Sequence, residues 1–315
     1  MEFKELESFV TIAKVKSFSK AASQLFLTQP ALSNHIAKLE AELGITLFER
    51  NNKRTELTPA GQQFYLSAIE ILNQREHALL NLEKYQGKIE GLLQVATSSV
   101  PGQYVLPDIL TRFHEIYPDV TFNLHHLSSR EITDSLVNGD LDFGFVGASP
   151  DNRNLIYEKV QDDELVVIAP NKPPYSEMES ISFSELLDAP LLLRKPGSGT
   201  RQAFDIAYKQ HAYLGKSANI LAHMDNNEMV LLCVKAGLGL SIVSSISIED
   251  KVKAGFLRVL PLRNYTFEHA FYFVYPQKRT LSPMVARFRD RKKTAWSSRL
   301  DKRRLSTFLI DRNFS

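Results

Sequence analysis

The first sixty residues carry short stripes of apolar residues at helical spacing, separated by turns. Such a stripe runs from Glu2 to Lys14, and the short segment SKAASQLF follows it. In the next segment, QPALSNHIAKLE, Leu32, Ile36 and Leu39 recur at i, i+4 and i+7 and define one buried face. We predict two short helices joined by a tight turn, which is a helix-turn-helix pattern.

The opposite face of QPALSNHIAKLE carries a single charge. It consists of small or neutral polar residues and one lysine: Pro30, Ser33, Asn34, Ala37 and Lys38. Ser33 can bond several base edges, Asn34 suits adenine, and Lys38 suits a phosphate. We interpret this face as a contact surface for DNA bases, with a protein-binding three-helix domain as the alternative.

The residues around this helix also suit DNA binding. Ser17 or Ser19 can cap the second helix, while Thr28 can cap the third, with Pro30 in its first turn. In GITLFERNNKRTELTP, apolar residues flank a turn-rich centre, so we expect a small β-hairpin, or wing. Three basic residues of this wing can reach phosphates or a narrow minor groove: Arg50, Lys53 and Arg54.

A long helix is predicted from Leu57 to Gln86. Its apolar residues fall on one heptad seam: Tyr65, Ala68, Leu72, Leu79 and Leu82. Arg75 interrupts the seam. Because no nearby segment offers a matching stripe, we expect this helix to pair with its copy in a dimer, with a hinge at Gly87 and Gly91.

After the hinge, apolar runs alternate with helical segments. The runs GLLQVATSSV, VTFNLHHLS, LDFGFVGA, ELVVIAP and PLLLRKP predict strands of parallel α/β sheets. Two such halves are expected, with the late strand AFYFVYPQ and the helix SPMVARF returning to the first. We place the first lobe at about 92–160 and 267–292, and the second at about 161–266.

Two turns of this region have the form of a ligand site. Each follows a strand and opens a helix, and together they supply Thr97, Ser98, Ser99, Ser198, Gly199 and Thr200. Ligands of open α/β sheets bind where helix N-termini present N–H groups. Each turn alone could be a simple helix cap, but two facing a cleft predict a site for a small anion or carboxylate. Weaker additions are Ser128, Ser129, Gly147 and Asn226.

Composition and charge narrow the class of protein. The 315 residues are 43% hydrophobic, with no apolar run near the roughly 20 residues that span a bilayer. The N-terminus is acidic, unlike a signal peptide, and Cys233 is the only cysteine, so we expect a cytoplasmic protein without membrane contact.

The positive charge of the chain is concentrated at its C-terminal end. Ala286–Ser315 holds ten basic and three acidic residues, a net charge of +7, which leaves −5 for the rest of the chain. The basic tail, 293–315, is either disordered or a nonspecific DNA clamp.

Catalytic and metal motifs are not supported. GSGTR lacks the spacing of a phosphate loop, and AGLGLSIV follows a helix, so a packing turn is expected there. His125 and His126 would point to opposite faces of a strand, and Cys233 resembles a buried structural thiol. We therefore expect no enzyme activity, no metal and no cofactor. The alternative is an enzyme or transport-type binding module with an appended helix-turn-helix.

The N-terminal segment closely resembles the winged helix-turn-helix of LysR-type transcriptional regulators. The matching motifs are S-x-A-A-x-x-L, T-Q-P-A-L-S, K-L-E-x-x-L-G, L-F-E-R and L-T-P-A-G, over about fifty residues. The resemblance implies base contacts by Gln29, Pro30, Ser33 and Asn34, and backbone or minor-groove contacts by Ser17, Thr28, Arg50 and Lys53. The family often has Arg at the position of Asn34, which argues here for adenine over guanine.

The resemblance also implies the organisation of the whole chain. We expect an α+β multidomain protein: a winged helix-turn-helix at 1–58, a dimerising linker helix at 59–87, a two-lobed effector domain like periplasmic binding proteins at 88–292, and a basic tail at 293–315. The expected assembly is a homodimer, and a homotetramer on a long operator with a T-N11-A-like core. The implied partners are double-stranded DNA, a small-molecule effector and RNA polymerase.

Overall fold

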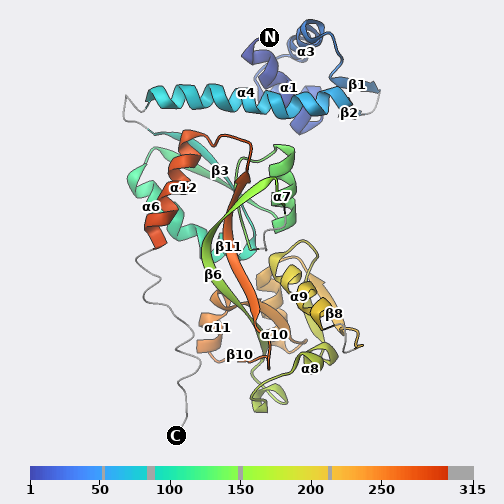
Figure 1. Ribbon diagram of the computed structural model, residues 1–315, viewed down its shortest axis with the longest axis vertical. Helices are drawn as coiled ribbons and strands as arrows, with labels where there is room; N and C mark the ends of the chain where they lie inside the picture. The colour runs from blue at the N-terminus through green and yellow to red at the C-terminus, as the bar shows by residue number, and fades with distance from the viewer. Residues whose placement is uncertain (52–53, 84–88, 148–151, 212–214, 297–315) are drawn as a thin grey trace. The chain divides into compact units, whose positions relative to one another are not determined.

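The computed structural model describes residues 1–51, 54–83, 89–147, 152–211 and 215–296. The chain divides into two compact units (Figure 1). Unit 1 contains residues 1–89, 137–142 and 278–286, and unit 2 contains residues 90–136, 143–277 and 287–315.

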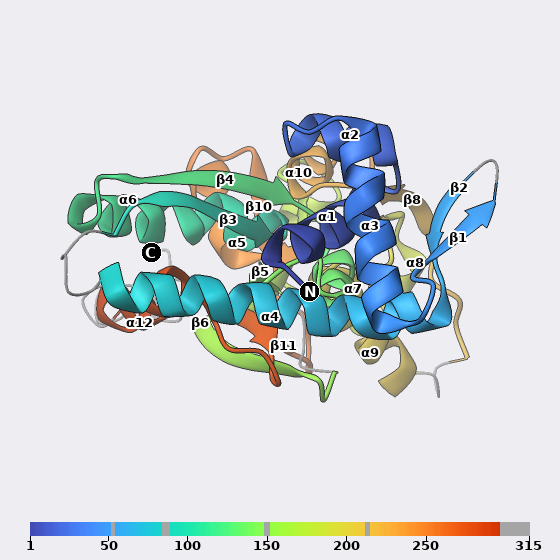
Figure 2. The same ribbon diagram turned by 90° about the horizontal axis from the view of Figure 1, so that it is seen from above.

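Unit 1 begins with a winged helix-turn-helix, as predicted. Its elements are α1 (Phe3–Val15), α2 (Phe18–Gln24), α3 (Gln29–Leu43), β1 (Phe48–Asn51), β2 (Arg54–Leu57) and α4 (Pro59–Glu83). Ser17 caps α2 by accepting from Lys20 N at 3.3 Å, and Thr28 caps α3 by accepting from Ala31 N at 3.3 Å. The antiparallel hairpin β1–β2 projects beyond the helices (Figure 2).

The core of this domain uses the start of the long helix α4. Phe9 of α1 packs edge-on against Phe48 and Tyr65, with ring centroids 5.4 and 6.4 Å apart. Tyr65 and Ala68 are 8% and 0% exposed within the same cluster as Leu32. The expectation that no nearby segment matches the seam of α4 is therefore wrong for its first two positions, because α1 covers them.

The later part of α4 is more exposed. Leu72 lies at the edge of the same core, while Leu79 is 49% exposed. Arg75 turns to α1, where it bonds Glu7 at 3.1 Å and lies over the ring of Phe3 at 4.9 Å. The side chain of Leu82 and the residue Gly87 lie outside the described part.

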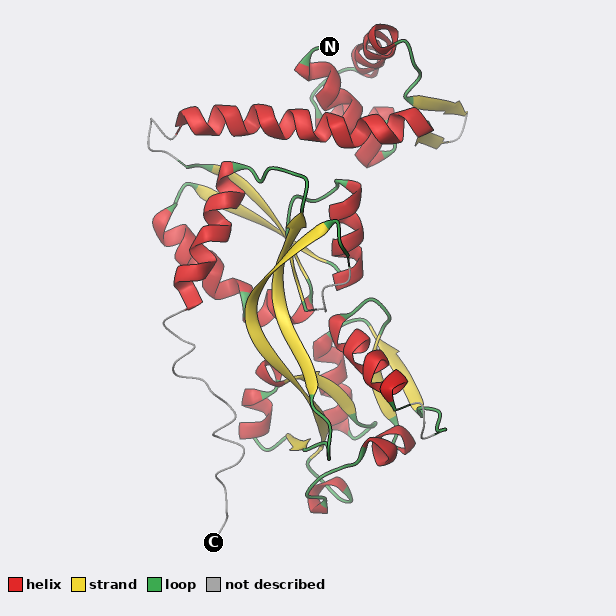
Figure 3. Cartoon of the chain, in the orientation of Figure 1, coloured by secondary structure: helices red, strands yellow, loops and turns green. Residues whose placement is uncertain are grey.

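Unit 2 has a mixed seven-stranded main sheet and a second sheet of two parallel strands. The strands of the main sheet are β3 (Gly91–Thr97), β4 (Val120–His126), β5 (Gly144–Val146), β6 (Leu155–Pro170), β9 (Ser241–Ser244), β10 (Leu257–Leu260) and β11 (Phe267–Pro276). They are ordered β10-β6-β11-β5-β3-β4, with β9 also on β6. β4 and β5 run parallel to β3, while β6 and β11 form a long antiparallel pair (Figure 3). Gly91, expected in a hinge, is the first residue of β3 and pairs with Val120.

The first lobe consists of β3–β5, the adjoining parts of β6 and β11, and four helices. These helices are α5 (Ser99–Tyr104), α6 (Leu106–Ile116), α7 (Ser129–Asn138) and α12 (Pro283–Trp296). Aromatic rings fill its core: Phe143 stacks on Phe273 at 5.1 Å, and Phe288 packs edge-on against Phe113 at 5.0 Å. In the structure β11 pairs with β5 and Phe288 of α12 lies in this core, so the last strand and helix lie against this lobe.

The second lobe contains the remaining elements. They are β7 (Leu191–Arg194), β8 (Ile220–Met224), β9, β10, η1 (Tyr175–Glu177), α8 (Phe183–Asp188), α9 (Gly199–Gln210), α10 (Asn227–Ala236), η3 (Ser245–Ser247) and α11 (Glu249–Lys253). The predicted strand ELVVIAP is the second half of β6, which crosses between the lobes without a break. In the turn AGLGLSIV, a Cβ at Gly239 would lie 2.3 Å from Pro190 O, so this turn is needed for packing.

No helix in the described part of the chain is both long and apolar enough to cross a membrane.

The close approach of α4 to the preceding turn gives a first prediction. A Cβ at Gly61 would lie 2.1 Å from Leu47 O, a backbone atom that cannot move aside locally. We expect Gly61→Ala to lower the free energy of unfolding by about 2 kcal/mol, because overpacking forces the backbone to shift. Urea denaturation followed by circular dichroism measures this. The exposed neighbour is the control: Gln62→Ala should change stability by less than about 0.5 kcal/mol, and equal effects would contradict the prediction.

Candidate ligand pocket and DNA-contact surface

The outer face of α3 is open for contacts. Its apolar face is buried in unit 1 through Leu32, Ile36 and Leu39. Six predicted DNA-contact residues are exposed: Thr28, Gln29, Pro30, Ser33, Asn34 and Lys38. Ser17 is half-buried. Arg50 and Arg54 lie in β1 and β2, but their side chains, like the residue Lys53, lie outside the described part.

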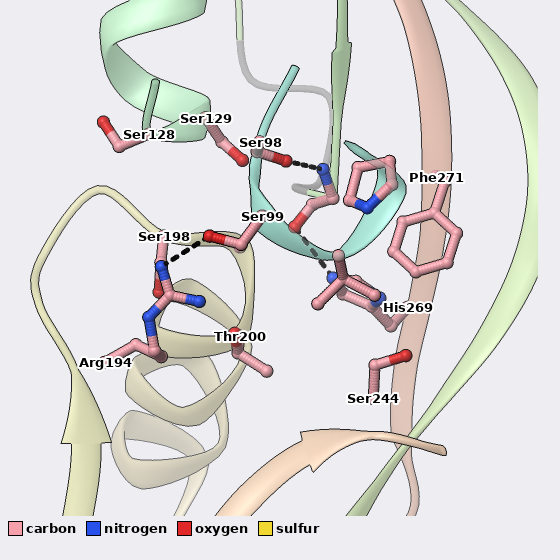
Figure 4. Close-up of a pocket in the computed structure, with 14 residues that line it drawn as sticks. Ser98, Ser99, Ser128, Ser129, Arg194, Ser198, Thr200, Ser244, His269 and Phe271 are labelled. Carbon is pink, nitrogen blue, oxygen red and sulfur yellow. Dashed lines mark hydrogen bonds between the residues drawn. The ribbon is translucent and has the colours of Figure 1, made fainter. Parts of the chain in front are cut away.

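A small polar pocket lies between the two lobes of unit 2 (Figure 4). Fourteen residues line it: Ser98, Ser99, Val100, Pro101, Ser128, Ser129, Gly147, Arg194, Ser198, Gly199, Thr200, Ser244, His269 and Phe271. The volume open to water-sized molecules is about 20 Å³.

Arg194, the last residue of β7, places a buried guanidinium in this pocket. The residue is 7% exposed, and Nη2 donates to Ser99 Oγ at 3.2 Å and to Asp225 O at 2.7 Å. Nε is buried and has no acceptor among the described residues. Burial lowers the pKa of Arg194 and the nearby Asp225 raises it, but a guanidinium stays charged at neutral pH. The side chain therefore brings a positive charge and an unused N–H donor to the pocket.

Hydroxyl groups at helix starts surround this charge. Ser129 Oγ at the start of α7 is buried and has no partner within the described part. Ser98 Oγ accepts from Gly147 N at 3.3 Å, and Ser198 Oγ caps α9 by accepting from Arg201 N at 3.1 Å. Each of these two hydroxyls has its own proton left to donate, so hydrogen-bond donors dominate the pocket.

A buried network closes the other end of the pocket. His269 of β11 bonds Asp163 Oδ2 through Nδ1 at 2.7 Å and donates from Nε2 to Gly147 O at 2.8 Å. Ser244 Oγ donates to Asp163 Oδ1 at 2.6 Å. The two carboxylate oxygens of Asp163 are thus engaged by protein donors, and the carboxylate is not among the pocket-lining groups.

The pocket brings together most of the predicted effector residues. Eight line it: Ser98, Ser99, Ser128, Ser129, Gly147, Ser198, Gly199 and Thr200. Two do not. Thr97 donates through Oγ1 to Ser98 O at 3.1 Å, and Asn226 caps α10 by accepting from Met229 N at 2.8 Å. Local capping thus accounts for Asn226 without a ligand.

Three polar lining residues were missed by sequence reasoning: Arg194, Ser244 and His269. Arg194 had a usable signal, because a charge ends the otherwise apolar run PLLLR, and a buried charge needs a partner. Ser244 and His269 lie on strands with no local motif. Their approach to the pocket depends on the pairing of β6 with β9 and β11.

The other candidate chemical groups have local roles. His125 bonds Gln94 Oε1 at 2.8 Å, while His126 Nε2 lies 2.9 Å from Ser99 Oγ at the edge of the pocket. Cys233 is half-buried against the core of the second lobe. The part of the chain that the structure describes contains no group of three or more His, Cys, Asp or Glu residues placed to hold a metal.

A winged helix-turn-helix joined to a two-lobed α/β body with a polar pocket defines a DNA-binding protein with a ligand-binding domain. Two family models match this division. Residues 3–62 match the bacterial regulatory helix-turn-helix protein of the lysR family, and residues 86–297 match the LysR substrate binding domain. The chain belongs to the LysR family and is a LysR-type DNA-binding transcriptional regulator.

Known relatives extend over nearly the whole chain. It is 32% identical over 286 residues to a RuBisCO operon transcriptional regulator of Acidithiobacillus ferrooxidans, covering 91% of each protein. Full-length OxyR from Pseudomonas aeruginosa has the same fold, with a TM-score of 0.73, 23% identity and 94% coverage of each chain. CbnR in complex with its target DNA is also similar, with a TM-score of 0.59 and 23% identity over 94% of this chain and all of that one.

The network at Asp163 gives a second prediction. Asp163→Asn should lower the free energy of unfolding by about 2–3 kcal/mol, because an amide cannot accept from both Ser244 and His269. Equilibrium denaturation measures the loss. Asp162→Asn is the matched control: this side chain is 78% exposed and pairs with Lys159 on the surface, so removing its charge should cost less than about 1 kcal/mol. Equal losses in the two variants would show that the buried network does not stabilise the fold.

Proposed function

We propose that this LysR-type regulator responds to a small anionic effector held in the pocket between its two lobes. The observation that carries this proposal is the buried guanidinium of Arg194, whose Nε has no acceptor among the described residues. The nearby carboxylate of Asp225 pairs with Lys195 at 2.5 Å, and a buried charge without a directly bonded counter-charge costs several kcal/mol. An anion beside Nε would supply that counter-charge and the missing acceptor.

An effector in this pocket would contact both lobes. Ser98 and Ser129 come from the first lobe, and Arg194 and Ser198 from the second. The lobes also meet directly at Gly197, whose carbonyl accepts from Arg130 N at 3.1 Å. A ligand that bonds both lobes favours the arrangement in which they approach, by an amount limited to its differential affinity for the two states. Such a shift can be passed to the DNA-binding domains of an assembly.

On the DNA side, α3 is the proposed reading helix. Ser33 and Asn34 meet base edges, with adenine the preferred partner of Asn34, and Lys38 contacts a phosphate. The remaining proposed contacts are Gln29 and Pro30 at bases, and Ser17, Thr28, Arg50, Lys53 and Arg54 at the backbone or minor groove. Exposure of the described side chains of this set supports the proposal.

The proposed assembly is a dimer that pairs through the later part of α4, and a tetramer of two such dimers. Tyr65 and Ala68 are buried in their own chain, so pairing is left to the part of the seam near Leu79. Two paired copies would present two α3 helices to a dyad-symmetric operator, with a T-N11-A-like core. RNA polymerase is the proposed protein partner, and the cytoplasm the proposed location.

The alternative is an enzyme that carries a DNA-binding domain. Catalysis by acid and base groups would require titratable side chains that converge on the bound molecule. Here the lining holds serines, a threonine, one arginine and one histidine whose two nitrogens are both engaged. Consumption of the effector by the purified protein in a turnover assay would favour the enzyme.

The DNA proposal predicts a separation of specific from nonspecific binding. Ser33→Ala and Asn34→Ala should each weaken binding to an operator by about tenfold, because each removes a base contact worth about 1–3 kcal/mol. Both should leave binding to random DNA unchanged. Lys38→Gln should weaken binding to any sequence and reduce the salt slope by about one. Fluorescence anisotropy on operators selected from a random pool measures these effects.

The control for this experiment is Lys209→Gln, an equal charge change at an exposed position of α9 in unit 2. It should leave both affinity and salt slope unchanged. If Asn34→Ala weakens random and selected DNA equally, Asn34 does not read bases.

The assembly proposal predicts that pairing depends on the side of α4 that carries Leu79. Leu79→Asp should shift sedimentation toward smaller species, because it places a charge on the proposed seam. Leu66→Asp is the matched control, since Leu66 is similarly exposed, at 43% against 49%, but lies off the seam. Equal dissociation by the two variants, or by neither, would contradict pairing along this seam.

A further inference from the structure

We infer that the pocket around Arg194 selects a small, fully ionised inorganic oxyanion of the sulfate type, over phosphate and over organic acids. The inference rests on the proposed function and names the class of its effector. It comes from Arg194 Nε and Ser129 Oγ, which are buried without partners among the described residues and belong to two side chains of a pocket whose lining has no carboxylate.

The size of the pocket favours an inorganic ion. Its volume of about 20 Å³ is far below the roughly 300–1,000 Å³ typical of sites for drug-sized organic ligands. Val100, Pro101 and Phe271 are the lining residues with apolar side chains, and the others are polar residues or glycines. A compact oxyanion can take bonds from several sides in such a space, whereas a carbon chain would need to extend outside it.

The groove beside the pocket gives an organic anion little to bind. Its basic residues include Arg130 and Lys195, which already pair with Asp134 at 3.7 Å and with Asp225 at 2.5 Å. Glu131 also borders the groove, and bonds from Ser128 lower the pKa of Glu131, so it stays ionised. A second carboxylate of an extended ligand would meet these acidic side chains rather than a free cation.

The donors of the pocket fit the oxygens of such an ion. Arg194 Nε and Ser129 Oγ are both buried without partners, in residues 7% and 3% exposed. Ser129 begins the ten-residue helix α7, and Ser198 caps the twelve-residue helix α9. Backbone N–H groups in the first turn of such helices favour negative charge. A guanidinium, hydroxyls and two helix starts thus surround one small space.

The absence of a carboxylate from the lining distinguishes sulfate from phosphate. Phosphate carries at least one proton at neutral pH and needs an acceptor for it, whereas sulfate only accepts. Asp163 is occupied by Ser244 and His269, and Gly147 O by His269. Among the side chains of the lining, the acceptors left are hydroxyl oxygens, which bind a proton less strongly than a carboxylate. Phosphate would therefore lose affinity that sulfate keeps.

The test is isothermal titration of the full-length protein with four anions at pH 7.5. The protein is dialysed into chloride buffer, and sulfate, selenate, phosphate and malonate are added at matched ionic strength. Sulfate and selenate should each bind one site per chain. Phosphate should bind at least tenfold more weakly, because its proton lacks a strong acceptor, and malonate more weakly still.

Three variants locate the site. Arg194→Gln should abolish sulfate binding, and Ser129→Ala should weaken it about tenfold by removing one bond to the ion. Ser129→Ala removes a hydroxyl without a protein partner, so it should still fold if Arg194→Gln does not. Lys209→Gln is the control: it makes the same charge change at an exposed side chain of α9 that does not line the pocket, and should bind sulfate normally.

The outcomes separate this inference from the proposed function. Phosphate binding as tightly as sulfate, through Arg194, would overturn the selection of an ionised anion but leave an anionic effector. If malonate alone binds, through Arg194, the inference of an inorganic ion is wrong, but the proposal of an anionic effector remains. Binding of no anion, or sulfate binding unchanged by both Arg194→Gln and Ser129→Ala, would overturn the inference and the anionic effector together.

Discussion

A guanidinium buried without a carboxylate partner is the constraint that organises the ligand pocket. Water solvates an arginine well, and its burial is tolerated only where hydrogen bonds and a counter-charge replace that solvation. Arg194 Nη2 donates to Ser99 Oγ and to Asp225 O, and these two bonds use part of the hydrogen-bonding capacity of the guanidinium. Nε and the hydroxyl of Ser129 have no partner among the described residues, and the proposed anion would supply one to both.

The fold supplies this site from elements far apart in the chain. β7 delivers Arg194 from the second lobe, while the starts of α5 and α7 deliver serines from the first. The crossing strands β6 and β11 join the lobes and carry Asp163 and His269, which hold the far end of the pocket. The same strands that connect the lobes thus shape the place where a ligand would bridge them. Because β6 and β11 both join the lobes and carry residues at the pocket, the charge in the pocket and the arrangement of the lobes are linked.

Local patterns predicted the fold well where local interactions determine it. Helix caps at Ser17 and Thr28 and the apolar stripe of α3 depend on neighbours three or four residues away, so the sequence shows them. The partner of a stripe is not local: α4 has a heptad seam, yet its first part packs on α1 of the same chain. The turns with serines at helix starts were enough to predict about half of the residues that line the pocket. Arg194 and His269 reach it through tertiary approach, which strand periodicity does not encode.

The most direct measurement of the central claim is anomalous diffraction from crystals of the full-length protein grown with selenate. Selenium gives a signal that distinguishes the ion from water and from chloride. The account predicts a peak in the pocket, with a selenate oxygen within hydrogen-bond distance of Arg194 Nε and Ser129 Oγ. A peak only in the outer groove, or none in either place at a selenate concentration that saturates binding in solution, would contradict it.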